Sequence, residues 1–450
     1  MEEINREILI IFIIIDFFIV FILFFLGLFF IYKGIKEKPN KEGNSVQNKH
    51  KQNGNNKENE NNLGDLSWIK KVECAKPNTE FWFNSVLFEK DKLYIAGIFE
   101  DYTKNLGLIC MDLKGDVIFA KSWIVKDYLD MGFSDINNYD RHNILLSGWI
   151  GNQGFLSILD KKSFSLRIKK VFETGSMVID SNEDFIFSAT LDGFIFKLNK
   201  KNLAINGLKK IDNASFNYIS LQNKKGEYVG LYDIKGMVII LDRDFSKILR
   251  AYKTNIYQKP LIDEDGFLYL LDQQDNILIM SKIDIVKGNI VLTKQYNTVH
   301  DFSTGDFYVS SDCRTDSILL AITFDNTYKG KGNDIEFLRI NKNDLNVMWS
   351  AIFGTNEDEE VAMKTICSLP DNYLFSARHS KTGKYGYAIK LNTTKKFDNA
   401  YITTRNTVAI DIDYKPVQDF SVSLNSKVKI INKPIPRVEE RKIDIISVDL

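Results

Sequence analysis

Hydrophobic and polar residues follow three different patterns along this chain of 450 residues. Residues 8–32 are apolar apart from Asp16, residues 33–64 are almost entirely polar, and from Trp68 onward short apolar runs alternate with turn residues. The first pattern is typical of a membrane-spanning helix, the second of a disordered linker and the third of β-strands. We therefore expect a membrane-anchored protein with one large all-β region.

The first pattern runs for 25 residues, from Ile8 to Tyr32, with a single charge. A helix of this length spans about 37 Å, which exceeds the hydrocarbon core of a bilayer at about 30 Å. A cleavable signal peptide would have a shorter apolar region followed by a small-residue cleavage site, and neither occurs here. We predict a retained single-pass transmembrane helix at residues 8–32, in contact with the lipid bilayer and preceded by a short flank at residues 1–7.

Asp16 is the candidate contact residue of this helix. A charge inside the bilayer costs about 2.5–3.5 kcal/mol on insertion scales, so a functional role is a natural hypothesis. A contact with a helix of another membrane protein is one interpretation, and an ion-coupling role is a second. The third is a place near the interface, where a tilted helix lets the carboxylate reach water. The sequence leaves these interpretations open.

Two signals disagree about the side of the membrane on which the rest of the chain lies. Four lysines occur between residues 33 and 41, whereas Arg6 precedes the helix, and the positive-inside rule then favours a cytoplasmic position. The family resemblance described below favours export. We expect the extracytoplasmic side and keep the cytoplasmic side as the alternative.

The second pattern, at residues 33–64, is an Asn- and Lys-rich segment with nine Asn between Asn40 and Asn62. Such a segment has too little apolar surface to offset the entropy lost on ordering. We expect a disordered linker with a reach of roughly 30 Å, which holds the following domain near the membrane while letting it swivel.

The third pattern is a repeat. Apolar runs recur with starts 40 to 55 residues apart, at Leu93, Ile144, Phe185, Tyr228, Leu268, Ile318 and Tyr373. A second strand-like run follows each of them and ends in Asp or Asn, namely Asp112, Asp160, Asn199, Asp242, Asp284, Asn341 and Asn392. These side chains can bond to the backbone two residues further on and tolerate left-handed conformations, so we interpret them as hairpin-turn residues and not as metal ligands.

Further strands precede and follow most of these pairs, as in FNSVLFE before Leu93 and NVMWSAIF after Asn341. Four strands in about 45 residues, repeated seven times, predict a seven-bladed β-propeller over residues 65–402. Residues 403–450 contain four more strand-like runs. They could form an eighth blade, close the ring against residues 68–74, or build a small appended β-unit.

One repeat resembles a known family. Residues 348–392 carry, at the places of the repeat pattern, Trp349, Phe353, Gly354, Asp358, Glu359, Asp371, Asn372, Ala377, Ile389, Lys390, Leu391 and Asn392. This blade resembles the bacterial β-propeller repeats of exported and surface proteins. The chain is more distantly similar to quinoprotein-like propellers, including lipoproteins that assist outer-membrane assembly. It lacks the repeated Trp-docking motifs (AxDxxTGxxxW) of true quinoprotein enzymes, so the resemblance does not extend to a bound quinone. The resemblance implies a propeller fold and export, and says little about activity.

Composition narrows the class of partner. Lys and Arg number 59, as do Asp and Glu, so the net charge is zero and no global field attracts nucleic acid. The four cysteines (Cys74, Cys110, Cys313 and Cys367) are far apart, and we expect free thiols over disulfides because a domain of this size can fold without cross-links.

The search for catalytic or metal-binding residues finds no motif that predicts an enzyme, and we expect no cofactor. The four histidines (His50, His142, His300 and His379) lie in the linker and in different repeats and registers. The acidic stretches Glu357–Glu360 and Asp263–Gly266 fit solvated turns better than a calcium loop. Residues 329–334 predict an exposed loop of the kind that carries binding sites on a rigid scaffold.

The sequence therefore favours a non-enzymatic protein-interaction scaffold that binds protein partners on a propeller face, in an envelope or cell-surface assembly. The alternatives are a propeller enzyme or ligand sensor that uses the central funnel, and a membrane process centred on Asp16.

Overall fold

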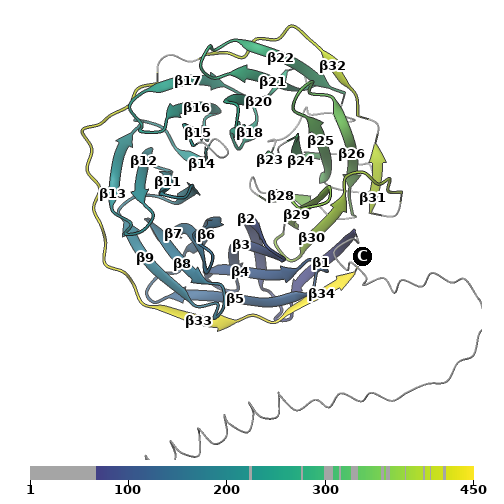
Figure 1. Ribbon diagram of the computed structural model, residues 1–450. Helices are drawn as coiled ribbons and strands as arrows, with labels where there is room; N and C mark the ends of the chain where they lie inside the picture. Colours follow the sequence, from purple (N-terminus) through teal and green to yellow (C-terminus); the bar gives the residue numbers. More distant parts are fainter. Residues whose placement is uncertain are drawn as a thin grey trace, which may run out of the picture. The chain divides into compact units, whose positions relative to one another are not determined.

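The computed structural model describes residues 67–449 apart from residues 222–225, 275–276, 298–307, 314–315, 326–332, 356–358, 361–364, 381, 399–400, 406 and 419–421. The described residues form seven sheets around a common axis, antiparallel except for the β18–β23 pair, which confirms the predicted seven-bladed β-propeller (Figure 1). The predicted membrane helix with Asp16, and the linker, lie outside the described residues.

The first three blades are each built from four consecutive strands, ordered from the axis outwards. Blade 1 is β2 (Glu80–Glu89), β3 (Lys92–Glu100), β4 (Lys104–Asp112) and β5 (Val117–Val125); blade 2 is β6 (Met131–Asn138), β7 (Asn143–Ile150), β8 (Gln153–Asp160) and β9 (Leu166–Phe172); blade 3 is β10 (Met177–Ser181), β11 (Phe185–Thr190), β12 (Phe194–Asn199) and β13 (Ile205–Lys210).

The next three blades follow the same order, with β18 added at the inner edge of blade 6. Blade 4 is β14 (Phe216–Leu221), β15 (Tyr228–Asp233), β16 (Met237–Asp242) and β17 (Ile248–Lys253); blade 5 is β19 (Leu261–Ile262), β20 (Phe267–Gln274), β21 (Ile277–Asp284) and β22 (Ile290–Tyr296); blade 6 is β18 (Tyr257–Gln258), β23 (Tyr308–Cys313), β24 (Ser317–Asp325), β25 (Asn333–Asn341) and β26 (Val347–Phe353).

Blade 7 closes the ring by joining the two ends of the described chain. Its inner strands are β27 (Glu359–Glu360), β28 (Ile366–Ser368), β29 (Tyr373–Ser380) and β30 (Gly386–Asn392), and its next strand is β1 (Trp68–Cys74). β1 pairs with β30 on one side and with β34 (Ile445–Asp449) on the other. The first and last strands of the ring therefore share one sheet, which removes the exposed edges that an open ring would have.

The last fifty residues form a belt along the outer edges of the blades, visible as the yellow strand around the ring in Figure 1. In chain order, β31 (Ile402–Arg405) pairs with blade 6 and β32 (Ala409–Asp411) with blade 5. Single bridges then touch blades 4, 3 and 2, and β33 (Val438–Lys442) pairs with blade 1. Among the described residues there is no eighth blade. The predicted closure of the ring against residues 68–74 occurs through the pairing of β34 with β1. The belt itself was not predicted.

Seven hydrophobic clusters fill the seven junctions between neighbouring blades. The closing junction, for example, places Val72 of β1 with Phe81 of blade 1 and Phe375 of blade 7. The predicted runs supply these side chains because alternate residues of a strand face opposite sides, and both sides of a propeller blade are covered by neighbours.

The turns divide the ring into two faces. Lys92, the first residue of β3, pairs with Asp112, the last residue of β4, so the turns that join first to second strands and third to fourth strands lie at the same end. We call this end the hairpin face. The described chain also enters there, since the Asn392 amide donates to the Ser67 hydroxyl at 3.0 Å. The opposite face carries the second-to-third turns and the connections between blades.

Candidate binding site at the axis of the ring

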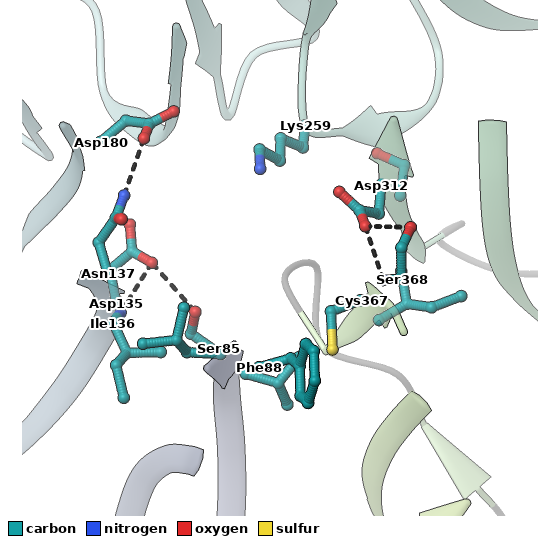
Figure 2. A pocket seen from close by; sticks show the side chains of 14 residues that line it. Ser85, Phe88, Asp135, Ile136, Asn137, Asp180, Lys259, Asp312, Cys367 and Ser368 are labelled. Carbon is teal, nitrogen blue, oxygen red and sulfur yellow. Dashed lines mark hydrogen bonds between the residues drawn. The ribbon is translucent and has the colours of Figure 1, made fainter. Parts of the chain in front are cut away.

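The inner strands enclose a cavity of about 260 Å³ at the axis. Its lining comes from the ends of the inner strands next to the first hairpins, so the cavity lies at the hairpin face. The polar side chains include Ser85, Asp135, Asn137, Asp180, Lys259, Ser311, Asp312 and Ser368, with Phe88 and Cys367 adding apolar surface (Figure 2).

Two aspartates of the cavity each connect neighbouring blades in the first half of the ring. The Asp135 carboxylate accepts the Ser85 hydroxyl of blade 1 at 3.0 Å and the Ile179 amide of blade 3 at 2.9 Å. The Asp180 carboxylate accepts the Asn137 side-chain amide of blade 2 at 2.8 Å. Asp180 also accepts a backbone amide of blade 4, at residue 221, at 2.9 Å.

The third aspartate repeats this arrangement near the closing junction. Asp312 of blade 6 accepts the Ser368 amide at 2.7 Å and the Ser368 hydroxyl at 2.6 Å, both from blade 7. Short first strands leave amides at the inner edge without a partner in their own sheet, and a carboxylate from the neighbouring blade supplies the acceptor. These aspartates therefore hold the inner edge of the ring together.

Two further polar residues, Lys259 and Ser311, also line this cavity. Lys259, between β18 and β19, extends into the open space between Asp180 and Asp312 (Figure 2). Ser311 is only 2% exposed, and among the described residues its hydroxyl has no hydrogen-bond partner. A buried hydroxyl without a partner costs about 1–3 kcal/mol, but its oxygen has almost no exposed surface, so a ligand in the cavity would reach it only after a local rearrangement.

The arrangement is suited to binding more than to proton transfer. Three carboxylates and one ammonium line the cavity, which gives it a negative field. The carboxylate oxygens already accept amide hydrogens, whereas a general base needs a free lone pair within reach of the substrate. Among the residues that the structure describes, no group of three or more His, Cys, Asp or Glu side chains is placed to hold a metal ion.

The seven predicted turn residues all lie at the ends of third strands, on the hairpin face. Each accepts a backbone amide from its own turn; the Lys114 amide, for example, donates to Asp112 at 2.8 Å, and the Asn343 amide to Asn341 at 2.8 Å. The corresponding bonds are made by Asp160, Asn199, Asp242, Asp284 and Asn392. These side chains are remote from the axial cavity, because third strands lie away from the inner edge.

The sequence did not lead us to predict a second feature of these turns, a residue in the left-handed conformation. Four turns place a bulky residue in the left-handed region, at Phe164, Leu203, Phe245 and Leu345, with φ between 54° and 57°. Gly115 and Gly288 take this role in blades 1 and 5. Leu345 is fully buried, so core packing offsets the strain that this conformation imposes on a side chain with a Cβ. An apolar residue or a glycine three or four positions after the Asp or Asn was the available signal in six of the seven turns.

The other candidates of the sequence are dispersed. Asp263 is buried, and its carboxylate accepts the Phe267 amide and the Tyr269 hydroxyl, so it stabilises its own turn. His142 lies exposed in the first hairpin of blade 2, beside Arg141. His300 and most of the residue 329–334 loop lie outside the described residues.

The four cysteines are free thiols. Cys110 is buried between blades 1 and 2, and burial raises the pKa of its thiol to about 12. Burial likewise raises the pKa of the Cys313 thiol to about 12. Thiols with such pKa values are poor nucleophiles at neutral pH, so their role is in packing.

No helix that could span a membrane occurs among the residues the structure describes. No protein-family model matches the chain, and no curated protein sequence matches it either. Among solved structures, the chain is similar to the WD40 domain of coronin from Toxoplasma gondii, with 12% sequence identity, a TM-score of 0.49, and coverage of 74% of this chain and 88% of that one. At this level of similarity, the identification of the fold rests on the strand pairing within the chain.

Proposed function

We propose that this protein is a membrane-anchored, non-enzymatic scaffold that binds a protein partner on a face of its propeller. The observation that supports this function best is the role of the axial carboxylates. Asp135, Asp180 and Asp312 are all engaged in joining blades, which makes the ring rigid and leaves its charge available for recognition. A rigid, preformed surface loses little entropy on binding.

The predicted anchor and linker would place this scaffold at a membrane. A helix at residues 8–32 would confine the ring to the membrane surface, and the linker would raise its effective concentration near membrane partners. The resemblance of residues 348–392 to repeats of exported proteins supports an envelope or cell-surface assembly on the extracytoplasmic side. Asp16 would then be a contact to a partner helix.

Cross-linking of the full chain in intact membranes tests the scaffold function. The control is the anchor and linker alone, residues 1–66, which would share the location but lack the ring. We expect a partner protein whose cross-links map to propeller loops and disappear in the control. If every cross-linked protein is recovered equally with residues 1–66, the scaffold function is wrong. Alkaline extraction of the same membranes checks the anchor, which should keep both chains in the pellet.

A ligand sensor that uses the central funnel is the second candidate, and the axial cavity of about 260 Å³ with its polar lining is the observation that favours it. A small molecule held there would raise the melting temperature of the full chain by binding only the folded state. A Ser311→Leu variant, which fills the cavity, should lose that shift while keeping protein cross-links at the loops.

A further inference from the structure

The outer wall of blades 2 and 3 is strongly basic. Residues 161–175 and 200–214, which follow the third strands of these blades and contain β9 and β13, hold nine Lys and Arg but only two Asp and Glu. Residues 422–437 of the belt run along the same two blades and add four bases and no acid (Figure 1). Among the described residues, only Lys161 and Lys433 of these bases pair with a carboxylate. We call this surface the basic wall.

The rest of the outer circumference is close to neutral. The equivalent segments of blades 1, 5, 6 and 7, with the belt over them, together hold eleven bases and nine acids. Blade 4, with its part of the belt, holds five bases and three acids over residues 243–257 and 412–421. The segments counted for the other four blades are residues 68–74, 113–127, 285–299, 342–356, 402–411 and 438–449.

The belt itself creates this difference. At blades 1, 5 and 7, a belt carboxylate neutralises a lysine of the strand beneath it. The pairs are Lys121 with Glu440 at 2.6 Å, Lys294 with Asp411 at 3.2 Å, and Lys70 with Asp449 at 2.7 Å.

Over blades 3 and 2 the belt carries the opposite charge. Lys427 and Lys429 lie between the bridges at Asn425 and Asn432, beside strands that are already basic. Like charges on neighbouring strands repel each other and lower the stability of the fold. A segment that served only to close the ring would gain from carboxylates here, as at the other blades. The lysines therefore indicate an anion outside the chain.

Exposed aliphatic side chains accompany these bases. Ile431 and Ile435 are 59% and 56% exposed, and they lie between Lys429 and Arg437. The aromatic residues of the wall are not exposed. Surfaces that bind single-stranded nucleic acid offer aromatic side chains for stacking, whereas surfaces that lie on a bilayer combine Lys and Arg with apolar side chains that enter the headgroup region. The wall has the second composition.

The proposed anchor would bring a bilayer within reach of this wall. A linker with a reach of roughly 30 Å lets the ring turn at the membrane surface, so a weak attraction on one side suffices to select an orientation. The stretch of belt between Asn425 and Asn432 spans at most about 25 Å and presents its bases outwards from the ring, which suits a broad surface better than a narrow ligand.

We infer that the basic wall rests on an anionic phospholipid bilayer, so that the ring stands on edge with blades 2 and 3 towards the lipid. The lysines and arginines contact the anionic headgroups, while Ile431 and Ile435 enter the interface. This inference goes beyond the proposed scaffold function and rests on its membrane anchor. It leaves both faces of the propeller open to a protein partner.

Quenching by a spin-labelled lipid tests the orientation. The full chain is reconstituted in phosphatidylcholine vesicles with or without about 30% phosphatidylserine. A nitrobenzoxadiazole label is attached at Ser426→Cys in the belt or, as the control position, at Met348→Cys on the outer strand of blade 6. Label taken up by the parent chain is subtracted. We expect phosphatidylserine to raise quenching about threefold at residue 426 and not at residue 348, and about 1 M salt to abolish the rise.

A charge variant and its matched control test the wall directly. The wall variant should abolish the rise and leave the melting temperature unchanged or higher, because like charges are removed. The control removes the same charge from exposed positions elsewhere and should keep the rise within about twofold of the parent. The wall variant is Lys169→Gln, Lys201→Gln, Lys427→Gln and Lys429→Gln, and the control is Lys114→Gln, Lys126→Gln, Lys395→Gln and Lys396→Gln.

The two isoleucines are tested by Ile431→Ser together with Ile435→Ser. This variant should lower the rise about twofold and keep its salt dependence, because the charges remain. An unchanged rise would overturn the insertion of these side chains into the interface.

Equal quenching at residues 426 and 348, or equal losses in the wall and control variants, would overturn the inference. A labelled duplex oligonucleotide that binds the full chain in neutral micelles, and that only the wall variant releases, would assign the wall to nucleic acid and overturn it too. If the rise is absent while cross-links to the ring persist, the scaffold function stands and the orientation is wrong. Loss of the cross-links and release of the chain by alkaline extraction would instead refute the proposed function.

Discussion

The belt meets the ring in two different ways. Over blades 6, 5, 1 and 7 it forms strands with several paired residues, as between β33 and β5 or between β34 and β1. Over blades 4, 3 and 2 it makes one bridge to each blade, such as that between Asn425 and Lys210. The middle segment also contains Pro416, Pro434 and Pro436, which cannot donate to a ladder. The comparison teaches that closure depends on the ends of the belt, while its middle mainly spans the distance.

Removing the end of the belt should have the largest effect on stability. A chain that ends at residue 437 lacks β33 and β34, and with them the side chains of Val438, Ile443 and Ile445 that pack on the core. We expect a loss of about 3–5 kcal/mol in the free energy of unfolding, measured by urea denaturation, because apolar contacts and the outer partner of β1 disappear together.

The matched variant keeps both ends and replaces residues 412–437 by a Gly/Ser segment of equal length. It should lose about 1–2 kcal/mol, mostly from the contacts of Val422, Leu424 and Ile430. Faster alkylation of Cys74, which lies beside Ile443 in the same cluster, should accompany the first variant and not the second. Equal losses in the two variants would show that the middle is as important as the ends.

Two proline substitutions test the same comparison between the ends and the middle of the belt, and each removes one hydrogen bond. Ile443→Pro removes an amide that donates to the Ala120 carbonyl at 3.1 Å, and Asn425→Pro removes one that donates to the Lys210 carbonyl at 2.7 Å. We expect losses of about 3 kcal/mol for the first and about 1 kcal/mol for the second in the same denaturation assay. A larger loss for Asn425→Pro would reverse the roles of the two regions.

The inner edge of the ring can be compared with the outer one. Asp312→Ala removes the acceptor of the Ser368 amide and hydroxyl, and leaves a half-buried inter-blade contact unsatisfied. We expect a loss of about 2 kcal/mol, below that of the shortened chain, because the hydrophobic junction between blades 6 and 7 remains. The midpoint of urea unfolding measures it, with Asp212→Asn, an exposed aspartate elsewhere on the ring, as the control.

The smallest effect concerns an exposed ion pair near the closing blade. Lys76 bonds to Asp101 at 2.8 Å, and this hydrogen bond holds the pKa of the Asp101 carboxyl below its usual 3.8. A depressed pKa stabilises the folded state above pH 4 and loses that contribution as the pH falls through the folded value. Lys76→Met should raise the pKa of Asp101 in an NMR titration, with little change in stability at neutral pH. An unchanged titration would assign the depressed pKa to the backbone amides of the loop.

The sequence predicted the parts of the fold that repeat. Second and third strands, such as those that contain Leu93 and Leu391, show alternating apolar residues and turn signals that suffice for a blade count. First strands were harder, because β18 and β19 have two residues each, and β18 precedes blade 5 in the chain but pairs with β23 of blade 6. The belt could not be predicted, since its residues pair with strands far away in the chain and follow no repeat of their own.

The candidate site was harder to predict from the sequence than the belt or the first strands. Asp135, Asp180 and Asp312 belong to no motif. Asp180 and Asp312 each lie one residue before the end of a first strand, whereas Asp135 lies three residues before the end of its strand. Their common role depends on amides of the next blade, which the pattern of one strand cannot reveal. The Asp and Asn turn residues, in contrast, act within five residues of themselves, so local chemistry was enough to identify their bonds.

The pairing of β1 with β34 also dictates an order of events during synthesis. Lys70 pairs with Asp449, so a strand made at the start of the propeller waits for residues 445–449 before its outer partner arrives. The first six blades have their own inner strands and can fold as they emerge from the ribosome, whereas the seal forms only after residues 445–449 have emerged as well. A message that ends early therefore yields an open ring with exposed strand edges, which is a substrate for cellular proteases.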